Sequence, residues 1–421
     1  MQANVVVVGA GAGGCVIAAR LSERSDCSVL LLEAGPDSGA PVQPWPRLLV
    51  VRTPEQAPTG YTRGFGVGGS AALNAMVANL GQPDDYDEWE RAYGCSGWNW
   101  RDVRPWFRRI ELPRRRAHRD QIGALSAAVL GSAGATRARL TRTRDGRRAG
   151  VKEVYLDPAR KRANLTVRGG ALVDRVLFEG HRAVGVLLAG GEVIDAGVVV
   201  VCAGAIHTPA ILLRSAVDRE GVGRGLHDHP SLSVPFVTRD DSRDARPVPV
   251  TVISRTSSRV GHHDAQLTPI DVPEGSSMMA AAMRVHSRGI VRLASQAATA
   301  DPIVEFNMLT DERDLDLLRT AAEFVQLTAR LRSIATLGTI GEFSTTDEAL
   351  RGAVGDYFHA AGSCRMGDAT DPMAVVDERC RVIGYQSLLV CDASVMPNLP
   401  RASPCLPTVM IAERVSAMMS P

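Results

Sequence analysis

The chain has 421 residues, of which 45% are hydrophobic and 5% aromatic, and this composition excludes a disordered or fibrous protein. Its length exceeds the range in which a single hydrophobic core keeps growing, so we expect two domains with a cleft between them. The 48 basic and 46 acidic residues leave a net charge of +2, which excludes a global field that would attract nucleic acid or an anionic membrane.

The first residues carry neither the basic start nor the apolar stretch of a secretory signal, and no segment has the uninterrupted apolar length of a membrane span. The sequence therefore predicts a cytoplasmic protein without a transmembrane segment. The eight cysteines are scattered without a CxxC pair, which argues against a disulfide framework and against a zinc ribbon. We expect most of them to be reduced and buried.

The start of the chain predicts one complete βαβ unit. Residues 4–8 (NVVVV) form an apolar run typical of a buried strand, and a glycine turn and an amphipathic helix over residues 15–23 follow. A second apolar strand then ends at Glu33.

The next part of the chain is less regular. Residues 63–74 are too rich in glycine for a regular element and end as a predicted helix start. Residues 84–111 hold most of the tryptophans at helix-like spacing, which predicts a helical packing surface. Residues 113–150 are rich in arginine without interleaved aromatic residues, which favours a solvated helix face and loop over a binding patch.

The second half of the chain begins with short β segments over residues 164–205, with a hairpin signal at Gly190-Gly191. A helix follows, with Thr208 as its predicted N-cap and Pro209 at its first position. Mixed β structure is expected over residues 230–291, then a helix over 311–333, a strand starting at 388, and a last helix opened by Pro407.

The glycine turn after the first strand predicts a dinucleotide site. Gly9, Gly11 and Gly14 form GxGxxG, which lets the backbone approach a pyrophosphate at the positive end of the helix, while Glu33 can accept hydrogen bonds from an adenosine ribose. FAD is favoured over NAD, because the chain leaves the fold after one βα unit and returns with a β-rich insert. A second cluster, Gly68-Gly69-Ser70, suits another close approach of backbone to a cofactor.

The stretch DYFHAAGSCRMGD over residues 356–368 places His359 and Cys364 five residues apart. This pair is compatible with a metal site, a thiol nucleophile with its base, or a base held against a cofactor. A zinc site is disfavoured because no second pair of ligands accompanies it. A neutral imidazole, in contrast, titrates near physiological pH and can act as a general base.

Taken together, these motifs resemble the glucose-methanol-choline (GMC) family of FAD-dependent oxidoreductases. The resemblance runs nearly end to end, through the opening GxGxxG, RGFGVGGSAALNAMV, GAIHTPAILLRSA, GVGRGLHDHP, SRGIVRL, HAAGSCRMG, AVVDERCRVIGYQSLLVCDASVMP and PTVMIAER. It implies an α/β fold with a glutathione-reductase-like Rossmann domain that binds FAD and a domain of sheet and helices over the flavin. We place the FAD domain at residues 1–84, 151–230 and 368–421, and the substrate domain at residues 85–150 and 231–367.

The resemblance also implies the roles of individual residues. His359 corresponds to the base that takes the hydroxyl proton of an alcohol while its hydride leaves for the flavin. Cys364 then has a structural role. The cofactor-binding positions carried over from the family motifs are Gly9, Gly11, Gly14, Glu33, Gly68, Gly69, Ser70, Asn74, Val77, Val173, Asp392, Pro407 and Thr408.

The chain departs from the family at Cys405, where a His or Asn usually shares the substrate oxygen with the first His. Its place before Pro407 predicts a helix N-terminus, where the dipole lowers a thiol pKa. Cys405 is thus a candidate catalytic partner of His359, as a weak donor or as a thiolate that could also capture an aldehyde product. The alternative is that it only fills space.

Other departures bear on the cofactor and the substrate. Leu73 stands where some members carry the His that links to flavin, so we expect non-covalent FAD. The loop in RSAVDREGVG lacks the Gly-Ile-Gly of the family signature. The chain is shorter than most members on the substrate side, which predicts a more open cleft and a bulky or carrier-borne substrate. The expected partner is thus a small-molecule or carrier-borne alcohol.

The remaining histidines are interpreted as non-catalytic, and no metal is expected. His227 and His229 have metal-like spacing, but they lie in a family segment that joins the domains, so a structural role is favoured. His262 and His263 are expected in a solvated loop, and His207 is expected to pack.

The sequence therefore predicts an FAD-dependent enzyme that oxidises an alcohol to a carbonyl. Its electron acceptor would be oxygen, a quinone or another redox carrier. The ending also resembles that of dehydrogenases associated with the redox cofactor mycofactocin. The alternatives are a lyase of the hydroxynitrile type with a redox-silent FAD, and a non-catalytic flavoprotein.

Overall fold

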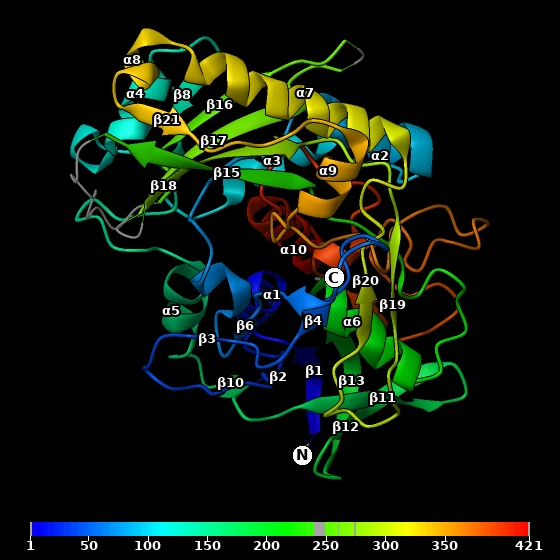
Figure 1. Ribbon diagram of the computed structural model, residues 1–421. Coiled ribbons are helices and arrows are strands. Elements are labelled where there is room, and N and C mark those ends of the chain that lie inside the picture. Colours follow the sequence, from blue (N-terminus) through cyan, green and yellow to red (C-terminus); the bar gives the residue numbers. More distant parts are fainter. Residues whose placement is uncertain (1, 240–248, 260, 273–274, 420–421) are drawn as a thin grey trace.

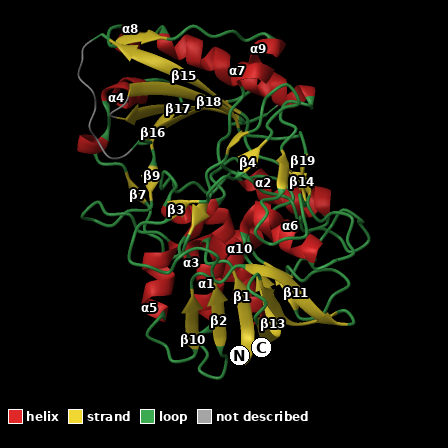
Figure 2. Ribbon diagram, turned by 60° about the horizontal axis from the view of Figure 1, so that its bottom comes forward, coloured by secondary structure: helices red, strands yellow, loops and turns green. Residues whose placement is uncertain are grey.

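The computed structural model describes residues 2–239, 249–259, 261–272 and 275–419, and two large sheets dominate it (Figure 1). The seven-stranded sheet has the order β10-β2-β1-β13-β12-β11, with β22 paired to β13. The six-stranded sheet has the order β21-β15-β18-β17-β16-β8. Figure 2 shows the two sheets in separate halves of the molecule, with helices packed against each. The predicted α/β class, with a dinucleotide-binding fold and a second domain of sheet and helices, is confirmed.

The strands of the seven-stranded sheet are β1 (Gln2–Val8), β2 (Val29–Leu32), β10 (Leu165–Arg168), β11 (Val173–Glu179), β12 (Arg182–Leu188), β13 (Val193–Val201) and β22 (Leu388–Val390). Those of the six-stranded sheet are β8 (Ala135–Arg137), β15 (Ser231–Thr238), β16 (Val252–Thr256), β17 (Ala265–Val272), β18 (Gly275–Ala282) and β21 (Gly338–Ile340). Smaller sheets contain β14 (Arg224–Leu226), β19 (Gly289–Arg292) and β20 (Ile303–Glu305), and the pairs β3 (Gln43–Pro44) with β6 (Gly64–Phe65), β4 (Leu49–Val50) with β5 (Thr59–Gly60), and β7 (Arg115–Arg116) with β9 (Arg139–Leu140).

The α-helices are α1 (Ala12–Leu21), α2 (Pro83–Tyr93), α3 (Trp100–Arg109), α4 (Ala124–Leu130), α5 (Asp157–Ala159), α6 (Gly204–Arg214), α7 (Glu312–Ala329), α8 (Arg332–Ala335), α9 (Asp347–Ala353) and α10 (Cys405–Met419). Short 3₁₀ turns are η1 (Gly69–Ala72), η2 (Arg119–Gln121) and η4 (Ala393–Val395), and η3 (Lys152–Leu156) is a π-helical turn.

The predicted βαβ unit at the start of the chain is confirmed. β1 lies between β2 and β13 and is parallel to both, and α1 connects β1 to β2. Residues 5–8 of β1, all of β2 and residues 199–201 of β13 are buried apolar runs, as expected for parallel strands covered on both faces. α1 packs on α10, so the last helix of the chain covers the first one. The first hydrophobic core is built around this sheet.

The six-stranded sheet is antiparallel in its described pairings and carries the second core. α7 packs on β17 and β18, and α4 packs on β16 and β17. The predicted mixed β structure over residues 230–291 is confirmed by β15 to β19, and the predicted helix over residues 311–333 by α7 and α8.

The tryptophan-rich segment forms two helices rather than one. α2 ends at Gly94, whose φ of 68° is left-handed, and α3 restarts after Asn99, whose side chain caps it. Trp89 and Trp98 are fully buried in the first core, so the predicted packing surface is confirmed. The proposed domain boundaries stay a prediction. The two large sheets fall on either side of them, except that α2 and α3 pack with the first core.

The predicted helix start at Pro209, with Thr208 as N-cap, is wrong. α6 begins at Gly204, and Pro209 lies inside it. The reason is the carboxylate of Asp392, which accepts hydrogen bonds from the Gly204 amide at 2.8 Å and from the Thr208 hydroxyl at 2.6 Å. With this remote group, the helix begins five residues earlier than it would with Thr208 as its N-cap.

In the part of the chain that the structure describes, no helix has both the length and the apolar content needed to cross a membrane.

Candidate active site

A cavity of about 580 Å³ lies between the two large sheets. The glycine turn after β1 forms one end, and side chains of β16, β17 and β18 line the other. The sequence-predicted residues that line it are Gly9, Gly11, Glu33, Gly69, Ser70, Asn74, Val77, Val173, His359, Asp392, Cys405 and Thr408. Gly14, Gly68 and Pro407 are not among the described lining residues.

The glycine turn has a separate requirement at each glycine. Gly9 has φ of +98°, and a Cβ at Gly14 would lie 1.9 Å from the Gly9 carbonyl oxygen. These two glycines are therefore needed for the turn and for the packing of α1 on β1. A Cβ at Gly11, in contrast, would have no atom of the described residues within 4 Å. Gly11 is also the N-cap of α1 and makes no side-chain cap, so the first amides of the helix face the cavity.

Glu33 follows β2 and is 7% exposed. Its carboxylate accepts hydrogen bonds from the amides of Ala10 at 2.9 Å, Gly35 at 2.9 Å and Gly66 at 3.2 Å. The side chain therefore holds three loops together at the cavity wall. Its predicted contact with a ribose stays a prediction.

The second glycine cluster closes over the first. Gly68 and Gly69 have φ of 110° and 52°, and a Cβ at Gly69 would lie 2.8 Å from the Cα of Gly11. The Ser70 hydroxyl accepts a hydrogen bond from the Gly64 amide at 3.0 Å. Two glycine segments that are 58 residues apart in the chain thus meet at one wall of the cavity.

Asp392 follows β22 and holds α6 and η4 around the cavity. Besides its bonds to Gly204 and Thr208, it accepts one from the Ser394 amide at 2.8 Å. Burial raises the pKa of this carboxyl, and its hydrogen bonds oppose the shift.

These residues fit a dinucleotide. The cavity offers open space at Gly11, uncapped amides at the N-terminus of α1, a carboxylate at the end of β2, and polar groups at Ser70 and Asn74 on the way to His359. Such a terminus with free amides favours a phosphate group. The predicted FAD therefore agrees with the residues that line this cavity.

His359 lines the cavity next to Tyr357, whose hydroxyl bonds with Gln266 and Thr268 of β17, and it is half-buried. Its Nδ1 lies 2.9 Å from the Nδ1 of His229, and its ring packs edge-on against Tyr357 with centroids 4.7 Å apart. Desolvation, followed by the nearby His229 and Arg63, holds the pKa of His359 well below its ordinary value. The imidazole is therefore neutral at pH 7.

His229 is fully buried at the end of the segment that joins the domains. Burial lowers its pKa to about 3, although the Met283 backbone opposes this shift. Its Nε2 makes no hydrogen bond of normal geometry with the described residues. A structural role was predicted for His229, and its contact with His359 gives it a place in the candidate site instead.

Asp228 connects the backbone at His359 to the cavity wall. One carboxylate oxygen accepts hydrogen bonds from the amides of His229 at 2.7 Å and His359 at 2.9 Å, and the other accepts from the Tyr61 hydroxyl at 2.7 Å. Burial and the neighbouring Asp356 raise the pKa of Asp228 to about 7, against the effect of the Tyr61 hydrogen bond.

Arg63 extends this network toward the turn that carries His359. Its guanidinium donates to the Tyr61 hydroxyl at 2.5 Å and to the carbonyl oxygen of Phe358 at 3.0 Å. Phe358 itself has φ of 61°, a left-handed conformation that is uncommon outside glycine. The network therefore supports the unusual turn from which His359 enters the cavity.

Asp228, His229 and His359 are close enough to hold a metal ion, since their ligand atoms lie within 4.8 Å of one another. However, the two Nδ1 atoms face each other, and both Asp228 oxygens already accept hydrogen bonds. The geometry is that of a hydrogen-bonded network, so we assign no metal here.

Cys405 is the first residue of α10, as its sequence position predicts, and it lines the cavity. Its predicted low pKa is wrong. Desolvation raises the pKa of the thiol to about 11, and this exceeds the lowering caused by Arg148 and by a hydrogen bond with Asn74. The side chain is a neutral thiol at pH 7, so a thiolate paired with an imidazolium is excluded as its resting state.

Of the remaining candidate residues, two lie outside the cavity lining and one is part of it. Cys364 is fully buried and is not among the described residues that line the cavity, so it is no partner of His359. His227 accepts a hydrogen bond from the Leu399 amide at 3.0 Å and contacts the Gly225 carbonyl at 2.7 Å, which confirms its structural role. His207 lines the cavity and stacks on Trp45 with centroids 4.1 Å apart.

The site residues that sequence reasoning missed are His229, Asp228, Tyr61, Arg63 and Tyr357. The motif HDH contains the first two, but its spacing cannot distinguish the buried structural His227 from the cavity-facing His229. Tyr61 and Arg63 lie about 300 residues from His359 in the chain, so no local pattern could pair them with it.

Comparisons with known proteins agree with this geometry. Family models described as GMC oxidoreductase match residues 3–137, 131–231 and 285–412. An uncharacterized GMC-type oxidoreductase of Rhodococcus erythropolis is 34% identical over 494 aligned positions, which cover 99% of this chain and 98% of the relative. Because the aligned length exceeds 421 residues, this chain lacks segments that the relative has.

Two further matches have a described activity. A 5-(hydroxymethyl)furfural oxidase of Methylovorus is 31% identical, with 98% of each chain covered. The crystal structure of pyridoxine 4-oxidase from Mesorbium loti superposes with a TM-score of 0.88 at 24% identity and covers 99% of each chain, so it has the same fold. The chain belongs to the glucose-methanol-choline (GMC) family of oxidoreductases, and its cofactor is FAD.

Proposed function

We propose that this protein oxidises the CH–OH group of an alcohol to a carbonyl, with the imidazole of His359 taking the hydroxyl proton. The observation that carries the proposal is a neutral histidine at the end of a dinucleotide cavity, held there by a second buried histidine. The relatives named as a 5-(hydroxymethyl)furfural oxidase and an oxygen-dependent choline dehydrogenase act on hydroxyl compounds, which supports an alcohol as substrate.

FAD would supply the acceptor for the hydride when it is bound. The residues that would hold it are Gly11 and the first amides of α1 at the phosphates, Glu33 at the ribose, and Ser70, Asn74 and Asp392 along the cavity. Leu73 also lines the cavity and has no nucleophilic atom, so the cofactor is held without a covalent bond at this position. Release of all the flavin on acid precipitation would support this, whereas flavin retained on the precipitated chain would contradict it.

A general base needs a ring nitrogen that is free to accept a proton. A neutral imidazole carries one N–H, and the contact between the two Nδ1 atoms requires one of them to donate. If His229 donates, Nε2 of His359 carries the proton and cannot act as base. If His359 donates, its Nε2 is free, and the proton of His229 lies on its own Nε2.

The second arrangement is the competent one, because it leaves Nε2 of His359 free to accept the proton of the substrate. The Met283 backbone raises the pKa of His229, which is the effect of an acceptor near its ring. His229 is therefore a positioning residue that fixes the tautomer of His359.

After His359 takes the substrate proton, both of its nitrogens carry hydrogen. The Nδ1–H bond to His229 would then be charge-assisted and stronger. Asp228 contributes at the backbone, because it holds the His359 amide at 2.9 Å. These contacts keep the base in place through proton transfer.

Three finer predictions from the sequence accompany this proposal as expectations. They are a cytoplasmic location, oxygen or another redox carrier as the electron acceptor, and a mycofactocin-associated subtype. Each needs a measurement on the purified protein or in its cell.

The test is the visible spectrum of the purified flavoprotein during anaerobic addition of a panel of alcohols, followed by air. Bleaching of the oxidised flavin band by an alcohol, with formation of the matching carbonyl, is expected. Fast recovery of the band in air would identify an oxidase, and slow recovery a dehydrogenase. A flavin spectrum that no alcohol changes would contradict the proposal and favour a lyase or a non-catalytic flavoprotein.

A further inference from the structure

A second cavity, of about 450 Å³, opens at the β8 edge of the six-stranded sheet. Four arginines line it, and we call it the arginine pocket: Arg116, Arg137, Arg139 and Arg255. Its other lining residues are Asn79, Leu130, Ala135, Thr136, Ala138 and Ile253. None of the described residues that line it is acidic.

The guanidinium groups of this pocket are poorly satisfied. Their side-chain hydrogen bonds among the described residues are long: Arg137 to the Ala117 carbonyl at 3.4 Å, Arg139 to the Arg114 carbonyl at 3.4 Å, and Arg255 to Gln266 Oε1 at 3.3 Å. In the described part of the chain, none of the four has a carboxylate within ion-pair distance.

Arg255 is the most informative of the four. It enters the pocket from β16, and desolvation lowers its pKa. Arg255 is partly buried, and a guanidinium withdrawn from water without a carboxylate partner is costly, so an anion is expected to compensate it. Among the described residues, the two buried arginines are both paired with carboxylates, Arg401 with Asp85 at 2.7 Å and Arg214 with Asp174 at 3.0 Å.

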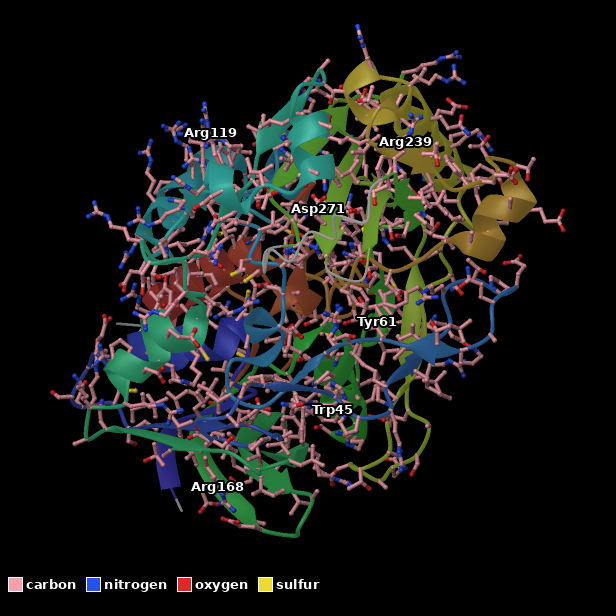
Figure 3. All side chains as sticks on the ribbon, turned by 60° about the vertical axis from the view of Figure 1, so that its left-hand side comes forward. Trp45, Tyr61, Arg119, Arg168, Arg239 and Asp271 are labelled. Carbon is pink, nitrogen blue, oxygen red and sulfur yellow. The ribbon has the colours of Figure 1, made fainter. Side chains whose placement is uncertain are left out.

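A solvated basic surface is the alternative for such residues. Arg119 belongs to the same basic run, and in Figure 3 it lies among side chains with nitrogen tips that project away from the ribbon. Arg116 and Arg139 are themselves exposed. The arginine pocket differs from that surface because Arg255, from a strand more than 100 residues later, meets the basic run in a concave site.

The arginine pocket adjoins the candidate active site. Asn79 and Ile253 line both cavities. Arg255 also bonds to Gln266, Gln266 donates to the Tyr357 hydroxyl at 2.8 Å, and Tyr357 packs on His359. One line of contacts thus joins the basic site to the proposed base.

We propose that the arginine pocket binds the phosphate group of an alcohol substrate whose hydroxyl group lies at His359. A phosphate carries close to two negative charges and several acceptor oxygens, whereas a carboxylate would neutralise only one of four guanidinium groups. Planar guanidinium groups bind phosphate oxygens in pairs. The assignment of this group to the substrate rests on the proposed alcohol oxidation, but binding of the phosphate does not.

Anion binding to the arginine pocket is therefore tested first, in an experiment that does not require the enzyme to turn over a substrate. Isothermal titration calorimetry of the FAD-loaded protein with inorganic pyrophosphate should detect a site that weakens at least tenfold in Arg137→Gln and in Arg255→Gln. Arg119→Gln, an exposed arginine of the same run outside the pocket, is the matched control and should bind like the wild type. Equal binding in all four proteins, or none in the wild type, overturns the proposal. Arg137→Gln decides the matter if the more buried Arg255→Gln fails to fold.

The second arm compares an aromatic alcohol with its phosphate ester, using pyridoxine and pyridoxine 5′-phosphate as the probe pair. The phosphate should raise kcat/KM at least tenfold in the wild type, chiefly through KM, and Arg137→Gln should remove this preference while the rate with pyridoxine stays the same. Measuring the same kcat/KM with an alcohol whose phosphate is linked to a nucleotide then distinguishes a small phosphate ester from a carrier-borne alcohol as the substrate. Pyrophosphate binding without any such preference would identify an effector site and overturn the substrate assignment. If no alcohol reacts but the calorimetry succeeds, the proposed function has failed and the anion site stands.

Discussion

The two ends of the active-site cavity are built by different means. At the glycine turn, the shape of the site is set by backbone over six residues: Gly9 and Gly14 are required by the backbone itself, whereas Gly11 leaves open space in the cavity. At His359, the site is assembled from side chains far apart in the chain, with 130 residues between His229 and His359 and about 300 between Tyr61 and Ala360. The end at the glycine turn is therefore built from residues close together in the sequence. The end at His359 depends on how the six-stranded sheet and its loops pack.

The largest expected effects are at the glycine turn, where one substitution should abolish folding and another should weaken only FAD binding. Gly14→Ala should prevent folding or leave an unstable apoprotein, because its Cβ would lie 1.9 Å from the Gly9 carbonyl oxygen. Gly11→Ala should fold normally but bind FAD more weakly, because its Cβ points into open space in the cavity. Flavin content and the thermal midpoint of the apoprotein measure the two effects. Gly39→Ala, with no described atom near its Cβ, is the control. Equal outcomes for Gly11 and Gly14 would contradict the separation.

The next largest effect is expected at His229, the neighbour of the proposed base. His229→Ala should lower the rate of flavin reduction by roughly 10- to 100-fold, as expected for a group that orients another one. His229→Asn keeps an acceptor near the Nδ1 position and should recover part of the rate. Stopped-flow reduction at matched flavin content measures this. A rate unchanged in both variants would show that the tautomer of His359 does not depend on His229.

The wild type and His229→Asn should also differ in how their stability depends on pH. The folded-state pKa of His229 is about 3 against 6.5 for the free side chain, so the unfolded state binds the extra proton between these values. Its contribution to stability is complete above pH 6.5 and is lost as the pH falls below it. Between pH 7 and pH 5.5 the wild type should therefore lose about 1 kcal/mol more unfolding free energy than His229→Asn.

Asp228 acts in the opposite direction, because its raised pKa of about 7 lets the folded state keep a proton that the unfolded state releases. Its effect is common to both proteins and cancels in the difference. Urea unfolding at the two pH values, followed by fluorescence, is the measurement. Parallel losses in the two proteins would mean that His229 is not buried as a neutral imidazole.

The smallest effect is expected at Cys405. Because burial raises the pKa of its thiol to about 11, the side chain is neutral across the working range. Cys405→Ser and Cys405→Ala should change the rate of flavin reduction less than about threefold, since a weak neutral donor contributes little. Cys405→Asn, which restores a family residue, is the informative third variant. A loss of more than tenfold in Cys405→Ala, or rapid alkylation of Cys405 at pH 8, would restore an active role for the thiol.

The βαβ unit and its glycines could be predicted from the sequence because apolar runs and local sterics determine them. The start of α6 could not, because the cap is the side chain of Asp392, which lies 188 residues away from Gly204. For the same reason, the HDH motif did not distinguish His227 from His229. The two residues share a segment, and only packing against Leu399 or His359 separates them.

The pKa of the Cys405 thiol could not be predicted from the sequence either. Its position at a helix N-terminus was predictable, and the helix dipole does favour a thiolate there. The balance between that dipole and desolvation depends on how deeply the cavity wall buries the thiol, which the sequence does not encode locally. The arginine pocket is a further example, because Arg255 joins the basic run only through the pairing of β8 with β16.

The central claim is that His359 is the base that takes the proton of an alcohol, and the most direct measurement is anaerobic stopped-flow reduction in wild type and His359→Asn. Both proteins should carry the same FAD content, because His359 is not one of the residues proposed to hold FAD. The account predicts a reduction rate lowered by roughly 100- to 10,000-fold in the variant, together with loss of the pH dependence of the wild type. A variant with full FAD content that is reduced as fast as the wild type would contradict the claim.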